Sequence, residues 1–581
     1  MDIMDITMPN EMIRKHKISA CHASFFILIS LASIPVASAS ETRITSNITA
    51  DAIYRESEDN EIRSDETVGQ LNPTLSISYQ SARINASINA RATYLERDNS
   101  EALNTQRNTY GSYNYSSRAE IIENLLFLSV DGGFTYRDGN ALNFLTSDFI
   151  NNSDSLVKTR TNSVAASMQT QKNRKFVANG TARYSLTETD QSEQGTDRLE
   201  DNNYSLSGNA QSNATEYGFI WNVSGSYIET ERGESSQSDF MTRNYVANAE
   251  INVIDDFGVF VTTLHDAYQY ESESNGVTTQ EFYSFGAGIT YRQNNQRFLR
   301  VAINRQIDPD INVELADDED INEDDYFLSS ELRWALSTRS NVSANYTRRS
   351  TGKTGQFSLN YNTRRLRARI NYNDSVTSYS RLISSPESLG LFVCQQGSSD
   401  ISSCFQPASL DYDLKAGEQF VDFLAPNYEI SEAVINRESL IGQVGLQGRV
   451  TNLSFNTRYS LDSSVDTGRQ TRTMSYGTSL SHRLGVRTKL NLSLTYAKVE
   501  NNLKSTVGLD GESENINGSI VFQHTFRSPL SANFGFYYIE RDNNILIEEA
   551  IGLKERRVQL SFTYTFANRN GARNANSQNN N

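Results

Sequence analysis

The stretch Arg556–Phe566, which reads RRVQLSFTYTF, decides the fold of this chain. Apolar residues occupy every second position in it: Val558, Leu560, Phe562, Tyr564 and Phe566. The positions between them are polar: Gln559, Ser561, Thr563 and Thr565. A strict period of two places the two sets on opposite faces only when the backbone is a β-strand. We therefore predict a strand with one fully apolar and one fully polar surface.

Composition decides between two explanations for such strands. The 581 residues are only 37% hydrophobic and have a mean hydropathy of −0.54, which is too polar for an ordinary buried core of this size. Disordered chains are equally polar but poor in aromatic residues. This chain has 29 Tyr and 27 Phe, many at alternating positions. A membrane barrel with a polar inner face accounts for both observations.

Alternating segments recur along the chain, and Arg83–Tyr94 and Lys175–Leu186 repeat the pattern clearly. Short turns and longer acidic loops such as Asp308–Asp325 separate the segments in alternation, as periplasmic turns and extracellular loops do. We predict an all-β fold: a transmembrane antiparallel up-and-down β-barrel of about 22–24 strands over residues 40–566. Its closing strand carries Val558, Leu560, Phe562, Tyr564 and Phe566 on the outside.

The N-terminal residues 1–39 have the features of an export signal. A basic segment precedes an apolar run from Ile18, and Ala37-Ser38-Ala39 matches a small-residue cleavage site. Met12 is an alternative start, and the residues around Cys21 leave a lipoprotein signal as an alternative reading. The predicted first strand follows almost directly, so we expect no plug domain before it. We expect the tail 567–581 to be disordered in the periplasm, and the mature chain to reside in the Gram-negative outer membrane.

Two cysteines remain after cleavage, Cys394 and Cys404, and an oxidising compartment favours a disulfide between them. Free thiols in a surface loop are the alternative. Both lie in the longest connection, residues 379–433, which is also more apolar than the other loops. Loops of this length are functional or disordered. We expect this one either to fold into the lumen and narrow it or to stand outside as an ordered cap.

Two pairs of segments carry a resemblance to a known family. Ser479–Arg483 leads into Leu490–Tyr496, and Phe522–Phe526 leads into Asn533–Tyr537. The chain resembles the outer-membrane β-barrels associated with PEP-CTERM/exosortase systems, over most of its mature length and through degenerate motifs. The resemblance implies a setting near exopolysaccharide production and protein sorting. It supplies no catalytic residues.

Nothing in the sequence predicts a catalytic, cofactor or metal site. His265 and Asp266 are the only adjacent pair of their kind, and neighbours in a strand face opposite ways. A barrel hydrolase is therefore the least favoured reading, and we expect no enzyme activity and no cofactor. The acidic run from Asp317 to Asp325 lacks the regular spacing and glycine of a calcium loop, so a solvated loop is the simpler interpretation.

The polar faces of the predicted strands carry arginines that would line the lumen: Arg83, Arg91, Arg183, Arg333, Arg367, Arg369 and Arg458. They could pair with carboxylates and only fill space, or form a basic pore lining that attracts anionic solutes. We therefore weigh a channel for polar or anionic solutes or polysaccharide against a non-conducting scaffold of an envelope machine. Expected partners are outer-membrane lipid and lipopolysaccharide, the barrel-assembly machinery, and polysaccharide-export or exosortase components, without nucleic acid.

Overall fold

The protein is described by a computed structural model. The described residues are 41–59, 62–99, 106–138, 149–150, 156–170, 176–190, 199–212, 218–233, 239–272, 276–294, 296–307, 326–350, 352–363, 365–384, 388–395, 418–424, 434–464, 469–502, 511–526, 529–545 and 552–566. The export signal, Cys404 and the C-terminal tail lie outside these residues, so the predictions about them remain predictions.

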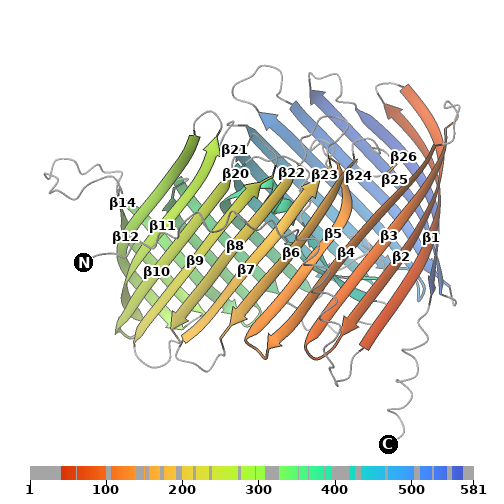
Figure 1. Ribbon diagram of the computed structural model, residues 1–581. Coiled ribbons are helices and arrows are strands. Elements are labelled where there is room, and N and C mark those ends of the chain that lie inside the picture. Colours follow the sequence, from red (N-terminus) through yellow and green to blue (C-terminus); the bar gives the residue numbers. More distant parts are fainter. Residues whose placement is uncertain are drawn as a thin grey trace, which may run out of the picture.

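Strands dominate the described chain (Figure 1). The first half contains β1 (Glu41–Asp59), β2 (Ile62–Gln80), β3 (Ile84–Asn99), β4 (Gln106–Ile122), β5 (Leu126–Asp138), β6 (Leu156–Gln169), β7 (Phe176–Thr189), β8 (Glu200–Ser212), β9 (Phe219–Arg232), β10 (Phe240–Ile254), β11 (Phe257–Ser272), β12 (Gly276–Asn294) and β13 (Arg297–Ile307). The second half contains β14 (Tyr326–Ser337), β15 (Ser340–Arg349), β16 (Gly352–Asn362), β17 (Leu366–Ser378), α2 (Tyr379–Ser384), β18 (Ser388–Gln395), β19 (Glu418–Leu424), β20 (Val434–Gln447), β21 (Thr451–Ser464), β22 (Gln470–Arg483), β23 (Thr488–Asn502), β24 (Gly511–Thr525), β25 (Leu530–Ile545) and β26 (Leu553–Phe566).

A single sheet of 24 strands forms a closed ring, because each strand pairs antiparallel with its neighbours and β26 pairs with β1. β17 pairs directly with β20, and β18 and β19 form a separate two-stranded sheet. The predicted antiparallel barrel is confirmed, with a ring at the upper end of the expected strand number. No helix in the described part of the chain is long and apolar enough to cross a membrane.

The outer surface of the ring is apolar. The five residues expected on the outside of the closing strand are all exposed there, from Val558 at 36% to Phe562 at 45%. Exposed Ile, Leu, Val, Phe and Tyr side chains continue around the other strands. A closed sheet satisfies all backbone hydrogen bonds internally, and an apolar exterior is stable only against lipid. The chain is therefore a transmembrane β-barrel of the Gram-negative outer-membrane type.

Tyrosines mark one boundary of the apolar belt. We call the end with the start of β1, the end of β26 and turns such as Asp255-Asp256 the turn end, and the opposite end the loop end. Outward-facing tyrosine hydroxyls donate to a glutamate two residues nearer the loop end, at 2.7 to 3.4 Å, in Tyr54–Glu56, Tyr94–Glu96, Tyr227–Glu229, Tyr283–Glu281 and Tyr538–Glu540. Such amphipathic rings belong at the lipid–water boundary. Barrels of this type have short turns on the periplasmic side and longer loops outside the cell, so the loop end faces the cell exterior and the turn end faces the periplasm.

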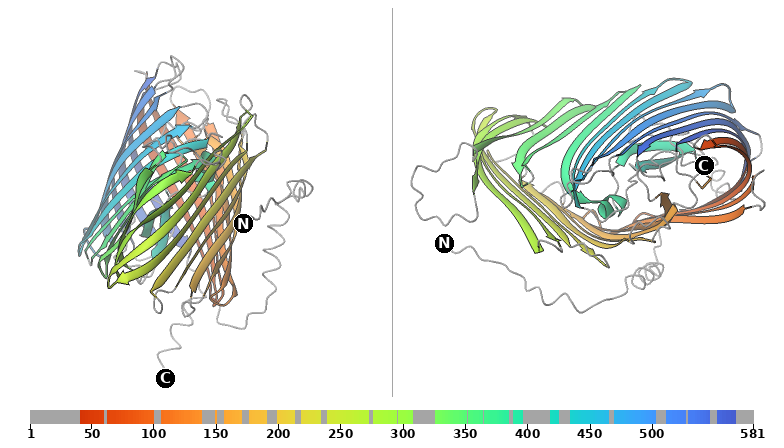
Figure 2. Two further views of the ribbon diagram at one scale, coloured as in Figure 1. Left: turned by 90° about the vertical axis from the view of Figure 1, so that its left-hand side faces the viewer. Right: turned by 90° about the horizontal axis from the view of Figure 1, so that it is seen from above.

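The ring is elongated when seen from above, and α2, β18 and β19 lie within its outline (Figure 2). We call β9–β17 the side lobe, and β1–β8 with β20–β26 the main lobe. The interior of the side lobe is a packed core that includes Phe260, Phe282, Phe298 and Ala302. Inward-facing Gly288 of β12 lets the neighbouring strand β13 lie close, because a Cβ there would collide with the main-chain oxygen of Val301.

Candidate functional site

Six of the seven arginines predicted to line the lumen project from strands toward the inside of the ring. Arg183 forms an ion pair with Asp131 at 3.1 Å, and Arg333 one with Glu331 at 3.7 Å. Arg91 donates to Asn72 at 3.2 Å. Arg458 is buried at 6% exposure.

Three of these arginines differ from the rest in their surroundings. Arg83 lies in the exposed turn before β3, where its main-chain oxygen accepts a hydrogen bond from Glu120. Arg367 and Arg369 point inward from β17, and no carboxylate among the described residues pairs with either. The basic lining is thus partly neutralised by carboxylates and partly without carboxylate partners in the described structure.

The two lobes are separated by contacts across the lumen. Helix α2 leaves the loop end of β17 and enters the ring, where it contacts β6 and β7. Its Ile383 packs against Val157 and Leu199 of one wall, and its Leu382 packs against Ile435 of the other. The start of the long connection therefore lies inside the ring. Whether the loop as a whole narrows the lumen remains a prediction, because most of it falls outside the described residues.

A second contact across the lumen lies beside α2. Phe240 of β10 and Tyr268 of β11 form a buried cluster with Val434 of β20, and Val376 of β17 packs against it. Phe240 is 1% exposed and Val434 is 1% exposed, so this contact is dry. Together with α2, it divides the ring at the loop end into two compartments.

The β15–β16 hairpin closes the side lobe from above. Pairing of β15 with β14 stops at Tyr346, and pairing of β16 with β17 stops at Gln356. Residues 347–350 and 352–354, which we call the hairpin tip, therefore pair with no neighbouring strand of the described sheet, and the pairs within the tip run from Thr347–Thr354 to Arg349–Gly352. Ser350 in the tip donates to the Asp266 carboxylate of β11 through its main-chain nitrogen, at 3.1 Å, and through its hydroxyl. We call this contact the latch.

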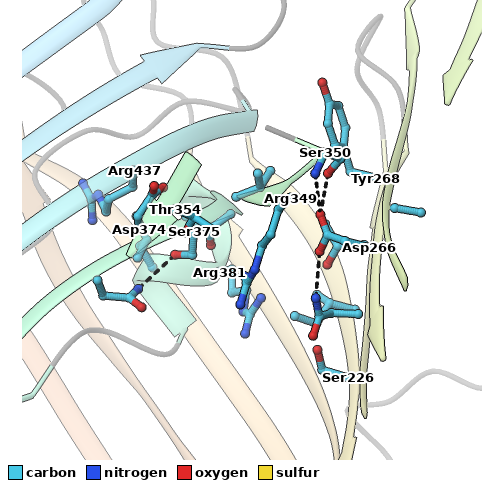
Figure 3. Close-up of a pocket in the computed structure, with 18 residues that line it drawn as sticks. Ser226, Asp266, Tyr268, Arg349, Ser350, Thr354, Asp374, Ser375, Arg381 and Arg437 are labelled. Carbon is cyan, nitrogen blue, oxygen red and sulfur yellow. Dashed lines mark hydrogen bonds between the residues drawn. The ribbon is translucent and has the colours of Figure 1, made fainter. Parts of the chain in front are cut away.

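A cavity of about 340 Å³ lies beneath the hairpin tip (Figure 3). Its lining comes from β9–β11 on one side and from β15–β17, α2 and β20 on the other. Three arginines reach it from three different elements: Arg349, Arg381 and Arg437. Asp266 and Asp374 also line it, together with several hydroxyl and amide side chains.

The three arginines of this cavity are held differently. Arg437 forms a bidentate pair with Asp462, with both contacts at 2.6 Å and both residues buried. Burial, and to a lesser extent the charge of Arg183, lower the pKa of Arg381 from its ordinary value. Arg349 has a buried Nε atom without a hydrogen-bond partner among the described residues. An anionic group in the cavity would stabilise Arg349 and Arg381, because both are partly buried basic groups that line it.

Two further cavities continue along the inner face of the side lobe toward the turn end. A cavity of about 410 Å³ shares Asn373 with the first, and its polar lining includes Asn345, Gln356 and Asn371. A smaller one of about 130 Å³ shares Glu331 and Arg333 with the second. The three cavities form a row from the hairpin tip to the turn-end half of the barrel.

A buried charge cluster surrounds the last cavity. Glu250 is 0% exposed and accepts bonds from Arg292 at 2.7 and 2.8 Å and from Arg300 at 2.6 and 3.0 Å. Arg300 also donates to Glu331 at 3.2 Å. Arg333 lies over the ring of Phe298. Two arginines on one carboxylate leave excess positive charge at this end of the row.

The remaining sequence-based hypotheses concern chemistry. His265 stacks on outward-facing Tyr283, with ring centres 4.2 Å apart, while Asp266 points inward to the latch, so these two cannot act together. Within the described ranges, no group of three His, Cys, Asp or Glu side chains could hold a metal ion. Cys394 lies in β18, but Cys404 falls outside the described residues, so the disulfide remains a prediction.

Sequence reasoning missed the residues that make the cavity. Arg349 ends a strand that was not singled out, Arg381 lies in a helix that was not predicted, and Arg437 follows the long loop. One signal was present in the sequence: two glycines, Gly352 and Gly355, at the start of β16, where a hairpin can leave the barrel wall.

No family model and no curated protein matches the chain. Among solved structures, it is similar to the FrpB iron transporter of Neisseria meningitidis, with 8% identity and a TM-score of 0.41, covering 90% of this chain and 83% of that one. It is also similar to the siderophore receptor PirA of Acinetobacter baumannii, with 12% identity, a TM-score of 0.40, and coverage of 90% and 80%. It is also similar to OccAB2 of Acinetobacter baumannii, with 9% identity and a TM-score of 0.29, covering 90% of this chain and 98% of that one. Scores this low carry no information about what this chain binds.

Proposed function

We propose that this protein is an outer-membrane channel for polar solutes that carry negative charge. The observation that supports this best is a set of inward arginines that form no ion pair in the described structure: Arg349, Arg367 and Arg369. Asp374 interacts electrostatically with Arg349 across the cavity, and Arg367 and Arg369 have no such carboxylate among the described residues. Fixed positive charge on the wall of a narrow, low-dielectric passage raises the local concentration of anions. An inner wall of Asn, Gln, Ser and Thr supplies hydrogen bonds for hydroxylated solutes.

The resemblance to barrels of PEP-CTERM/exosortase systems supports acidic exopolysaccharide, or its building blocks, as the natural solute. Uronic acids in such polymers combine a carboxylate with several hydroxyl groups. Both kinds of group have counterparts in the arginines and neutral polar residues of the inner wall. Polysaccharide-export or exosortase components would then be partners, and lipid and lipopolysaccharide the surroundings of the outer belt.

Planar-bilayer recording tests the channel proposal. Purified protein should give discrete conductance steps, and the reversal potential in a potassium chloride gradient should show preference for chloride over potassium. A protein that inserts, migrates as a heat-modifiable barrel and yet gives no conductance would contradict the proposal.

One observation favours the second candidate, a non-conducting scaffold barrel. Contacts between opposite walls through α2 and the Phe240–Tyr268–Val434 cluster hold the loop end together across the lumen. A scaffold needs such rigidity, whereas a simple pore does not. Absence of conductance, combined with co-purification of envelope components on the intact barrel, would support this candidate.

A further inference from the structure

The row of cavities in the side lobe offers a more specific site than the lumen as a whole. The cavity beneath the hairpin tip measures about 340 Å³, within the size range of small-molecule sites, and the tip covers it on the outer side of the barrel. The cavity therefore lies at the loop end of this lobe, where solutes from the cell exterior would arrive.

We propose that this cavity is a binding site for a carboxylated sugar, with Arg349 as the partner of the carboxylate. The proposal rests on the channel function proposed above and identifies where that channel recognises its solute. Arg349 faces the inside of the ring from the last position of β15, and its Nε is buried without a hydrogen-bond partner in the described structure. Asp374 in the same cavity interacts with Arg349 electrostatically but forms no ion pair with it there, so the guanidinium group can still bind a second carboxylate. A guanidinium group matches a carboxylate geometrically, because two parallel N–H groups can reach its two oxygens.

The rest of the lining suits a sugar better than a simple anion. Thr354, Ser375 and Asn244 offer hydroxyl and amide groups, and Tyr268 offers an aromatic wall. Arg381 reaches the cavity from α2 on the other side and adds positive potential (Figure 3). Arg437 is already neutralised by Asp462, so it contributes little to anion binding.

The charge of the lining changes from one cavity to the next along the row. The next cavity is lined by neutral polar groups such as Asn345, Gln356 and Asn371, and the last again by arginines, Arg292, Arg300 and Arg333. A solute held first by Arg349 would thus pass polar, uncharged walls before it meets positive charge again. Weak binding at several successive points allows both entry and release.

Isothermal titration of the detergent-purified full-length protein with sodium glucuronate tests the proposal, with glucose and sodium acetate as probes that lack the carboxylate or the hydroxyl groups. We expect glucuronate to bind more tightly than either. Arg349→Gln should weaken glucuronate binding by roughly tenfold or more, the usual loss for a charge-assisted hydrogen bond. Arg349→Lys should retain part of the affinity, and Arg381→Gln should have a smaller effect than Arg349→Gln.

Arg91→Gln is the matched control, because Arg91 faces the lumen of the main lobe and is bonded to Asn72 there. It should leave glucuronate binding unchanged, and heat-modifiable migration should show that every variant folds. Equal binding of glucuronate and acetate, or equal loss in the Arg349 and Arg91 variants, would overturn the proposal. If the wild type conducts chloride but Arg349→Gln does not change glucuronate binding, the channel proposal stands and this site does not. If Arg349-dependent binding occurs without conductance, the site stands and the channel proposal fails.

Discussion

The side lobe and the main lobe are built from the same alternating strands, yet their interiors differ. In the side lobe, the latch joins opposite walls, and the inward residues include the buried Phe260, Phe282 and Phe298. In the main lobe, charged side chains line the seam between β26 and β1, where Arg55 pairs with Glu66 at 2.6 Å and with Glu555 at 3.7 Å. Alternation fixes which residues face inward, but only the curvature of the ring decides whether they meet water or one another.

The largest expected effect follows from the buried carboxylate of the side lobe. Glu250→Gln removes the shared partner of Arg292 and Arg300 and leaves two buried cations without it. Loss of one member of a buried ion pair costs about 3–5 kcal/mol. We expect the free energy of unfolding, measured by denaturant titration in lipid vesicles, to fall by about that amount.

The matched change in the main lobe is Glu66→Gln, which removes a partner of Arg55 but leaves Glu555 beside it. Its effect should be clearly smaller, because Arg55 keeps a second carboxylate. Equal losses of unfolding free energy in the two variants would show that the buried ion pairs of the side lobe stabilise the barrel no more than those of the main lobe.

The second prediction concerns the close approach of the paired strands β12 and β13 in the side lobe. Gly288→Ala in β12 would place a methyl group against the main chain of Val301, which cannot move without breaking the β12–β13 pairing. Overpacking of this kind costs about 1–3 kcal/mol. In the main lobe, Gly518→Ala meets only Leu494 Cδ1 at 3.8 Å, an ordinary contact. Thermal gel-shift midpoints should fall for Gly288→Ala and stay unchanged for Gly518→Ala.

These two comparisons show what the sequence could and could not predict. Strand identity, facing and closure follow from local alternation, as the stretch ending at Phe566 illustrates, because every strand must present an apolar face to lipid. The side lobe depends on contacts between distant segments. The latch joins Asp266 and Ser350, and the dry contact joins Phe240 to Val434. No local period encodes such pairs, so their positions become visible only in the folded ring.

The same difference between local pattern and distant contact applies to the inward arginines. Period two correctly places Arg183, Arg367 and Arg369 inside, since facing is a local property. It cannot distinguish Arg183, which has Asp131 as a partner from another strand, from Arg367 and Arg369. It also misses Arg381, because α2 is a short helix held between two opposite walls of the main lobe, which the local sequence does not show.

The third prediction tests whether the hairpin tip can open. Asp266→Ala removes the acceptor of both Ser350 hydrogen bonds, which together contribute about 1–3 kcal/mol. In a background where the native cysteines are replaced by serine, Ser375→Cys places a thiol in the cavity. Loss of the latch should accelerate labelling of that thiol by a membrane-impermeant maleimide.

Asn244→Ala is the control for the latch, because Asn244 donates to the same Asp266 carboxylate at 2.9 Å from the neighbouring strand and does not reach the tip. It should leave the labelling rate close to that of the intact protein. Identical rates in the Asp266 and Asn244 variants would mean that the hairpin tip is held by its own backbone and not by the latch.

The smallest expected effect concerns ion selectivity. Arg367 and Arg369 lie near the turn end of β17, where no described carboxylate pairs with them, and their charge should favour anions at that mouth of the barrel. Replacing both with Ser should shift the reversal potential in a potassium chloride gradient toward cations. The shift should be modest because the arginines around Glu250 remain. Arg305→Ser removes a charge from the outer face, where Arg305 lies over Tyr326, and should not move the reversal potential. Unchanged selectivity in the double variant would show that the current does not pass along this wall of the side lobe.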